Sequence, residues 1–262
     1  MPELLKQSDL RSARDLPFCY LCGQAFASRS DNHPDHVPPK AIFALKDRDF
    51  PLKVASHSKC NEAHSPTDEV LGQLIAVSHG QFPDDDKVAI EFRQYNVDEF
   101  ATPFLGMVKT QFGNQIARWI RGFHSALYHE YLPINTPNAI HPPFPYGHLT
   151  DDGFVINDIE DQQYMFVKLI KKNRLAKRLD RIVCNNGKLQ YECVWMKTDQ
   201  GDWCCVFALQ VYDWVQLADN NFPRRGCVGW YQPVSGKPNY GTVASKLEFP
   251  YSNSDLLNAF AE

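Results

Sequence analysis

Two pairs of metal-ligating side chains lie near the N-terminus of this sequence, each with a two-residue spacer. The first is Cys19-x-x-Cys22 and the second is His57-x-x-Cys60. Such a spacer lets both side chains of a pair reach one ion, and two pairs supply the four thiolate and imidazole ligands that structural zinc prefers. A redox-active Cys-x-x-Cys or unligated thiols are the alternatives. A redox motif would not need the second pair, so we predict a structural Zn²⁺ site.

A second set of polar residues accompanies these pairs. Asp35 and His36 lie between them, and Asn61 and His64 follow Cys60. The oxygens of Asp35 and Asn61 suit Mg²⁺ or another divalent ion and leave positions for water and phosphate. On a strand, Asp35 and His36 would point to opposite faces. Either the backbone twists or bulges there, or the two residues address the substrate from different sides. A neutral histidine near a metal-bound phosphate can act as a general base toward water.

Together these residues resemble the HNH, or ββα-metal, nuclease family. The resemblance rests on Cys19-x-x-Cys22, on Asp35-His36-Val37-x-Pro39 and on Cys60-Asn61, and it covers about the first quarter of the chain. It implies that His36 is the general base and that Asp35 and Asn61 bind the catalytic ion. It also implies that the two ligand pairs form a zinc knuckle.

The sequence departs from the family pattern at three places. Pro51-Leu52 stands where Asn-Leu is frequent, His57 replaces a more common Cys, and His64 stands where a Lys often follows the Cys-Asn. His64 is therefore a third ligand of the catalytic ion or a phosphate contact. We expect metal-dependent hydrolysis of phosphodiester bonds, most simply in DNA. The alternative is a non-catalytic zinc-knuckle module that binds nucleic acid or protein, which would use only the zinc ligands.

The elements that position these residues predict an α+β fold with an N-terminal ββα-metal module. Flanking prolines confine the first strand to a few residues around Asp35, and residues 52–55 form the second. A helix from about Ser56 would place the second ligand pair, Asn61 and His64 along one face. We expect the nuclease module to span residues 15–78. A mixed helical and antiparallel-strand domain of unassigned fold would follow over residues 79–262, for substrate recognition, regulation or oligomerisation.

Two further helices are predicted after the one that carries His57 and Cys60. The Ser65-Pro66-Thr67-Asp68 start signature opens one that runs to about Val77, before a solvated acidic loop at residues 84–86. Apolar residues at three- and four-residue steps then predict an amphipathic core helix from about Lys109 to Tyr131. Its polar face carries Arg118, Arg121 and His124, and the two arginines are candidate phosphate contacts.

The most basic stretch of the sequence covers residues 168–181, where Asp180 is the one acidic residue. Such a run is either a solvated helix face or a surface for the nucleic-acid backbone, and the sequence leaves both open. The candidate backbone contacts are Lys171, Lys172, Lys177 and Arg178.

The remainder of the sequence predicts strands and tight turns. Asn185-Asn186-Gly187 and residues 199–202 are hairpin signals between segments rich in aromatic and β-branched residues. Five cysteines in this part have no paired spacing, so we expect core thiols, with a second zinc site as the minor alternative. They are Cys184, Cys193, Cys204, Cys205 and Cys227.

Composition places the chain among folded proteins without a membrane partner. The 262 residues are 44% hydrophobic, with no apolar run of membrane-spanning length and no signal-peptide core at the N-terminus. We expect a cytoplasmic protein with reduced thiols. The net charge of −4 argues against a general cationic coat for nucleic acid. It does not exclude local or metal-mediated phosphate contacts. The sequence also leaves open the choice between DNA and RNA and the formation of a homo-oligomer.

Overall fold

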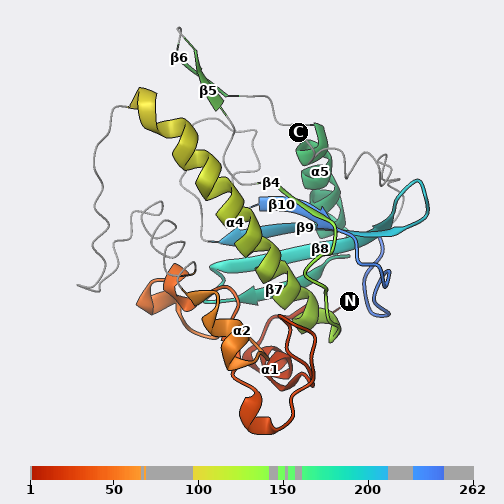
Figure 1. The fold of residues 1–262 in the computed structure, drawn as a ribbon. Coiled ribbons are helices and arrows are strands. Elements are labelled where there is room, and N and C mark those ends of the chain that lie inside the picture. The colour runs from red at the N-terminus through yellow and green to blue at the C-terminus, as the bar shows by residue number, and fades with distance from the viewer. Residues whose placement is uncertain are drawn as a thin grey trace. The chain divides into compact units, whose positions relative to one another are not determined.

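The computed structural model describes residues 2–65, 68, 97–141, 147–150, 153–156, 161–211 and 227–244. The fold is mixed α+β, which confirms the predicted class (Figure 1). The chain divides into two compact units. The first, here the knuckle unit, comprises Leu5–Ile134 and Cys184–Lys188. The second, here the sheet unit, comprises Met1–Leu4, Asn135–Val183 and Leu189–Glu262.

Three short elements of the knuckle unit follow one another as strand, strand and helix. They are β2 (Asp35–His36), β3 (Lys53–Val54) and α2 (Ser58–Glu62), and the two strands pair antiparallel with Asp35 opposite Val54. The prolines around β2 explain its length, because proline cannot donate to a ladder. Helix α2 begins two residues later than predicted and ends before His64. Before these elements lie α1 (Gln7–Arg11) and a 3₁₀ turn over Ser12–Asp15.

Helix α4 (Val97–Tyr128) is the long helix of the knuckle unit. It confirms the predicted amphipathic helix but begins earlier, and it ends at Tyr128 because His129 adopts a left-handed φ of 56°. Its predicted apolar stripe is buried wherever side chains are described, as at Trp119 and Phe123. The second predicted helix, from Ser65 to about Val77, lies outside the described residues apart from Ser65 and Asp68. The acidic loop at 84–86 and the predicted boundary at 78 also lie outside them.

The sheet unit is built on one six-stranded mixed sheet (Figure 1). Its strand order is β1-β7-β8-β9-β10-β4. Strand β1 pairs parallel with β7, whereas β8, β9, β10 and β4 pair antiparallel in succession. The strands are β1 (Glu3–Leu4), β4 (Asn138–His141), β7 (Asp180–Cys184), β8 (Leu189–Lys197), β9 (Trp203–Val211) and β10 (Cys227–Tyr231). A separate hairpin pairs β5 (Gly147–Thr150) with β6 (Gly153–Ile156).

Both predicted turns join consecutive strands of this sheet. Asn185, Asn186 and Gly187 all have φ between 52° and 75°, and Gly201 has φ 86°. Asparagine and glycine tolerate such values at little steric cost, which is why these short sequences specify the turns.

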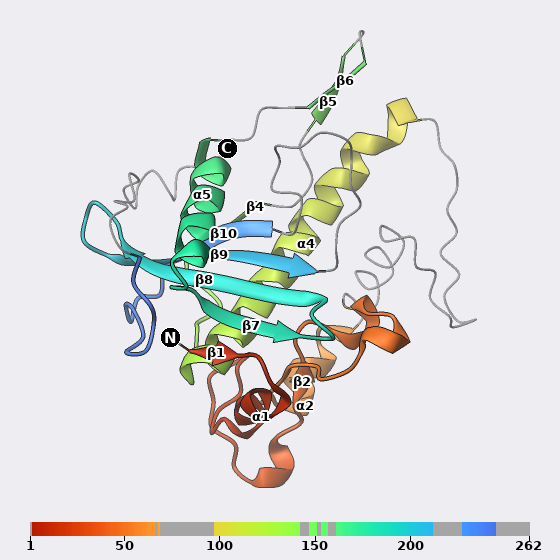
Figure 2. The ribbon, with the colours of Figure 1, turned by 180° about the vertical axis from the view of Figure 1, so that it is seen from behind.

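One helix, α5 (Asp161–Leu175), packs along one face of the sheet (Figures 1 and 2). The core between them includes Phe166, Ile170, Val206 and Trp230. All five cysteines predicted as core thiols are buried and free, and none belongs to a metal-ligand group among the described residues. Among the helices that the structure describes, none is both long and apolar enough to cross a membrane.

Candidate metal centre

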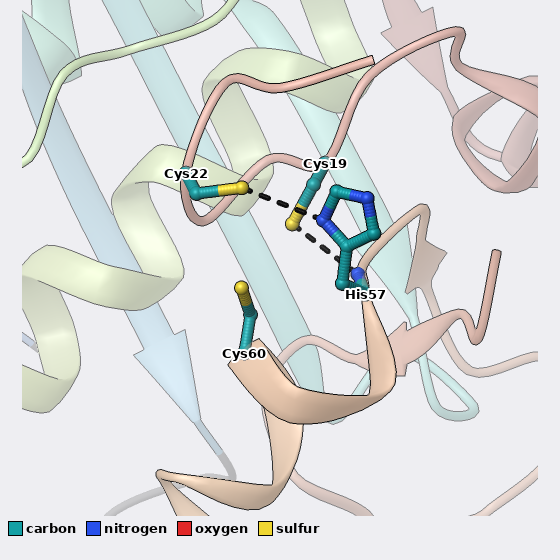
Figure 3. A group of neighbouring side chains, drawn as sticks. All are labelled: Cys19, Cys22, His57 and Cys60. Atoms are coloured by element: carbon teal, nitrogen blue, oxygen red, sulfur yellow. Dashed lines mark hydrogen bonds between the residues drawn. The ribbon is translucent and has the colours of Figure 1, made fainter. Parts of the chain in front are cut away.

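The two predicted ligand pairs converge on one point of the knuckle unit. The ligand atoms of Cys19, Cys22, His57 and Cys60 all lie within 4.8 Å of one another, and their side chains point inward (Figure 3). Cys22 Sγ is 3.5 Å from His57 Nδ1. A tetrahedral zinc with Zn–S of about 2.3 Å and Zn–N of about 2.0 Å requires a separation of about 3.5 Å. The group can therefore hold a zinc ion, as the spacing predicted.

A tight turn positions the first pair. Phe18 and Ala25 form an isolated antiparallel bridge, and the Gly23 amide donates to the Cys19 carbonyl at 2.8 Å. Gly23 has φ 77°, and a Cβ there would lie 2.8 Å from the Tyr131 ring. Only glycine fits both the backbone conformation and this close contact.

The second pair is positioned by the start of α2. His57 is the N-cap residue in extended conformation and Cys60 lies in the first turn, so both side chains leave the same end of the helix. The His57 amide donates to Cys19 Sγ at 3.3 Å, which links the second pair to the first. Burial and the neighbouring thiols Cys19 and Cys22 raise the pKa of the Cys60 thiol to about 12. A divalent ion would reverse this effect, because it deprotonates a coordinating thiol.

A pocket of about 400 Å³ opens beside the cluster. Its lining includes Cys22, His57, Cys60 and the exposed His33. Cys19 is fully buried, whereas the other three ligands are half-buried. One side of the centre therefore remains accessible to solvent.

Asp35, the first residue of β2, is buried in a hydrogen-bonded network. Its Oδ2 accepts from the Tyr20 hydroxyl at 2.6 Å and from Arg118 Nη2 at 2.7 Å. Burial and the Asp35 charge raise the pKa of Tyr20, so its hydroxyl stays protonated and donates. Burial works to lower the pKa of Arg118, but Tyr20, Asp35 and Asp68 raise it. No described residue makes a hydrogen bond to Asp35 Oδ1.

His36 lies in a different environment from its neighbour. It is half-buried and pairs in register with Lys53 on β3. Burial, followed by the Lys53 charge, lowers the pKa of His36 from its usual 6.5 to about 4. The imidazole is therefore neutral at neutral pH and can accept a proton.

Asn61 and His64 follow His57 and Cys60 on and after α2. Both are half-buried, and neither side chain hydrogen-bonds to another described residue. Burial and the charges of Arg118 and Arg121 lower the pKa of His64, while Asp35 opposes this shift. His64 is thus within electrostatic range of Asp35 and of both arginines. Apart from the zinc cluster, the described residues contain no group of three His, Cys, Asp or Glu side chains arranged around one point.

The two arginines of α4 have roles that the sequence did not indicate. Arg118 is 1% exposed and Arg121 is 7% exposed, so the polar face predicted to contact phosphate is buried at both positions. Arg118 binds Asp35 and Asp68, and Arg121 donates to the Leu21 carbonyl at 3.3 Å. The sequence analysis missed Tyr20, because a tyrosine between Cys19 and Cys22 has no distinctive spacing.

The basic stretch spans the last turns of α5, the loop after it and the first two residues of β7. Arg174 and Arg181 both pair with the buried Glu192 of β8. The four candidate backbone contacts, Lys171, Lys172, Lys177 and Arg178, are exposed. The structure therefore leaves them accessible, and their role remains a prediction.

Comparison with known proteins gives no family assignment: no protein-family model, curated protein or solved structure matches the chain.

Proposed function

We propose that this protein is a metal-dependent endonuclease of the HNH type that hydrolyses phosphodiester bonds in DNA. The observation that carries the proposal is the joint presence of the Cys₃His cluster and of Asp35, His36 and Asn61 on β2 and α2. The order strand, strand, helix is the one that the sequence resemblance implies. Neither a structural zinc site nor a buried aspartate alone would support this function.

The residues fit a second, oxygen-preferring ion. Asp35 Oδ1 has no hydrogen-bond partner in the described part of the chain, and the same holds for the Asn61 side chain. Carboxylate and amide oxygens are the ligands that Mg²⁺ and Mn²⁺ prefer. His64 would be a further ligand, because it lies within electrostatic range of Asp35. A divalent ion held there would stabilise the charge that develops on the phosphate and on the leaving oxygen.

His36 would perform the proton transfer. As a half-buried imidazole it would accept a proton from the attacking water, and its neighbour Asp35 would face the ion instead. The zinc cluster would brace α2, which carries Asn61, and would not react itself. The family resemblance implies a 5′-phosphate product.

A cleavage assay tests this proposal. Zinc-loaded protein would be incubated with plasmid, single-stranded and branched DNA and with RNA, each with Mg²⁺, Mn²⁺ or no added divalent ion. We expect DNA cleavage that requires the added ion and stops with a chelator at concentrations that leave the zinc bound. Folded, zinc-loaded protein that cleaves no substrate with any ion would rule the proposal out.

One observation favours the alternative, a non-catalytic zinc-knuckle module. The ion pair between Asp35 and Arg118 gives the buried carboxylate a structural use that needs no catalytic ion. Such a module would bind nucleic acid or a protein without cleavage, and its binding would not depend on Mg²⁺. A gel-shift assay with and without Mg²⁺, run beside the cleavage assay, separates the two functions.

A further inference from the structure

The contacts of Asp35 are divided unequally between its two oxygens. Oδ2 accepts hydrogen bonds from Tyr20 and from Arg118, at 2.6 and 2.7 Å. Arg118 Nε also donates to the Tyr20 hydroxyl at 3.3 Å, which closes a ring of three hydrogen bonds. Oδ1 takes part in none of these contacts. The Asp35 carboxylate is thus held through Oδ2, and Oδ1 is left available as a ligand.

Arg118 has no freedom to leave this arrangement. Its Nη1 donates to Asp68 at 2.5 Å and to Gln115 Oε1 at 3.0 Å, in addition to the contacts with Asp35 and Tyr20. Its side chain is 1% exposed. A buried guanidinium without these acceptors would carry an uncompensated charge, which is strongly unfavourable. Tyr20 and Arg118 therefore fix the orientation of Asp35, and Arg118 is itself held by Asp68 and Gln115.

We propose that Arg118 and Tyr20 are positioning residues that orient Asp35 so that a divalent ion binds through Oδ1 alone. The inference rests on the proposed function, because it assumes that Asp35 is a ligand of that ion. Hydrogen-bonding partners behind a metal ligand fix its orientation, and their removal typically weakens metal binding by about 10- to 100-fold.

An opposite role for Arg118 would give the opposite result. If its positive charge competed with the ion for Asp35, removing that charge would strengthen metal binding. The contacts favour positioning for two reasons. Arg118 leaves Oδ1 open, and its charge is also balanced by Asp68.

Manganese binding tests the inference without any measurement of cleavage. The free Mn²⁺ signal in electron paramagnetic resonance would be titrated with zinc-loaded full-length protein, and Asp35→Asn would identify the site. We expect Tyr20→Phe and Arg118→Lys each to weaken Mn²⁺ binding about tenfold, and Arg118→Met to weaken it further. Zinc content and circular dichroism would stay as in the wild type. Arg174→Met is the matched control, because it breaks an arginine pair with the buried Glu192 in the sheet unit.

The outcomes separate this inference from the proposed function. Tyr20→Phe removes a single hydroxyl, so it gives an answer even if Arg118→Met fails to fold. Folded Tyr20→Phe and Arg118→Lys proteins that bind Mn²⁺ like the wild type would overturn the positioning role. Tighter binding by either arginine variant would overturn it in favour of a competing cation. Wild-type protein without an Asp35-dependent Mn²⁺ site would overturn the proposed function, and this inference with it.

Discussion

Asp35 and His36 are neighbours in sequence that the fold places in different environments. Asp35 is 4% exposed and paired with Arg118, whereas His36 is half-buried beside Lys53. Alternation along a strand is the cause, because successive side chains point to opposite faces. A substitution at His36 can therefore remove chemistry without disturbing the Asp35 network.

His36→Ala should reduce DNA cleavage by about 10²-fold or more, because a general base typically contributes that much. Zinc content and melting temperature should not change, since among the described residues no side-chain hydrogen bond joins His36 to the cluster or to Arg118. Initial cleavage rates at saturating Mg²⁺ would measure the effect. His129→Asn is a suitable control, because it replaces an exposed histidine with a residue that tolerates the same left-handed backbone. Normal cleavage by His36→Ala would exclude His36 from the mechanism.

His124 on α4 should make the protein sensitive to acid. Burial lowers its pKa from the usual 6.5 to about 3. Between these values the unfolded chain binds a proton that the folded chain does not. Keeping His124 neutral therefore costs no folding free energy above about pH 6.5. As the pH falls from 6.5 toward 3, the free energy of unfolding decreases by at most about 1.4 kcal/mol per pH unit.

Urea unfolding at pH 7, 6 and 5 would measure this effect. We expect His124→Gln to show a shallower loss of stability with acid than the wild type, whatever its stability at pH 7. Loss of zinc at low pH affects both proteins alike and cancels in the comparison. Equal slopes for the two proteins would show that His124 does not carry the effect.

At the scale of elements, the Cys₃His cluster brings together two pieces that are too short to be stable alone. The Cys19–Cys22 turn has one isolated bridge, and α2 has five residues. An isolated helix of this length does not persist in water. An ion that binds both pieces would therefore contribute folding free energy directly.

Cys22→Ser should lower both zinc content and thermal stability. A loss of about 2 kcal/mol would lower the melting temperature by about 4–8 °C for a chain of this size. Metal analysis of the purified protein should find about one zinc per wild-type chain, as expected for four ligands. Cys227→Ala is the control, because this buried thiol lies in the sheet unit. Unchanged zinc content and melting in Cys22→Ser would contradict the knuckle assignment.

Local patterns were sufficient to predict much of the fold and the Cys₃His cluster that could hold a zinc ion. The apolar period of α4 and the turns at Asn185-Asn186-Gly187 and Gly201 depend on residues close in sequence. The spatial proximity of the two ligand pairs could be predicted because a tetrahedral ion needs four ligands, and each pair supplies two. For the proposed oxygen-preferring ion, the sequence indicated ligand types but no arrangement around a common point.

Contacts between distant residues without such chemistry could not be predicted. Arg118 lies 83 positions after Asp35, and helical periodicity assigned it to a polar face. Only the packed unit shows that this face is buried. The parallel pairing of β1 with β7 is similar, because Glu3 and Leu4 form too short a segment to carry a pattern.

At the scale of the whole molecule, the net charge of −4 conceals a local concentration of cations. Arg174 and Arg181 of the stretch from 168 to 181 share the single negative charge of Glu192. Lys171, Lys172 and Lys177 remain exposed on and after α5. Such a surface has a local positive potential even when the total charge is negative.

Changing Lys171, Lys172, Lys177 and Arg178 together to Gln should weaken DNA binding to a similar extent for all sequences. The slope of log affinity against log salt concentration should fall by about one for each phosphate that the variant no longer neutralises, since each such phosphate releases about one counterion. Cleavage at saturating DNA should remain close to wild type, because these residues lie outside the proposed metal sites. Fluorescence anisotropy titrations at two salt concentrations would measure both quantities.

A variant with the same charge change elsewhere distinguishes a binding surface from a general effect of net charge. It would change four exposed cations of the knuckle unit to Gln: Lys6, Arg11, Arg29 and Lys46. If the α5 surface binds the DNA backbone, only its own variant should flatten the salt dependence, because counterion release depends on the phosphates neutralised and not on total charge. Equal effects of the two variants would reduce the basic stretch to a solvated helix face. The nucleic-acid surface would then have to be sought beside Asp35 and His36.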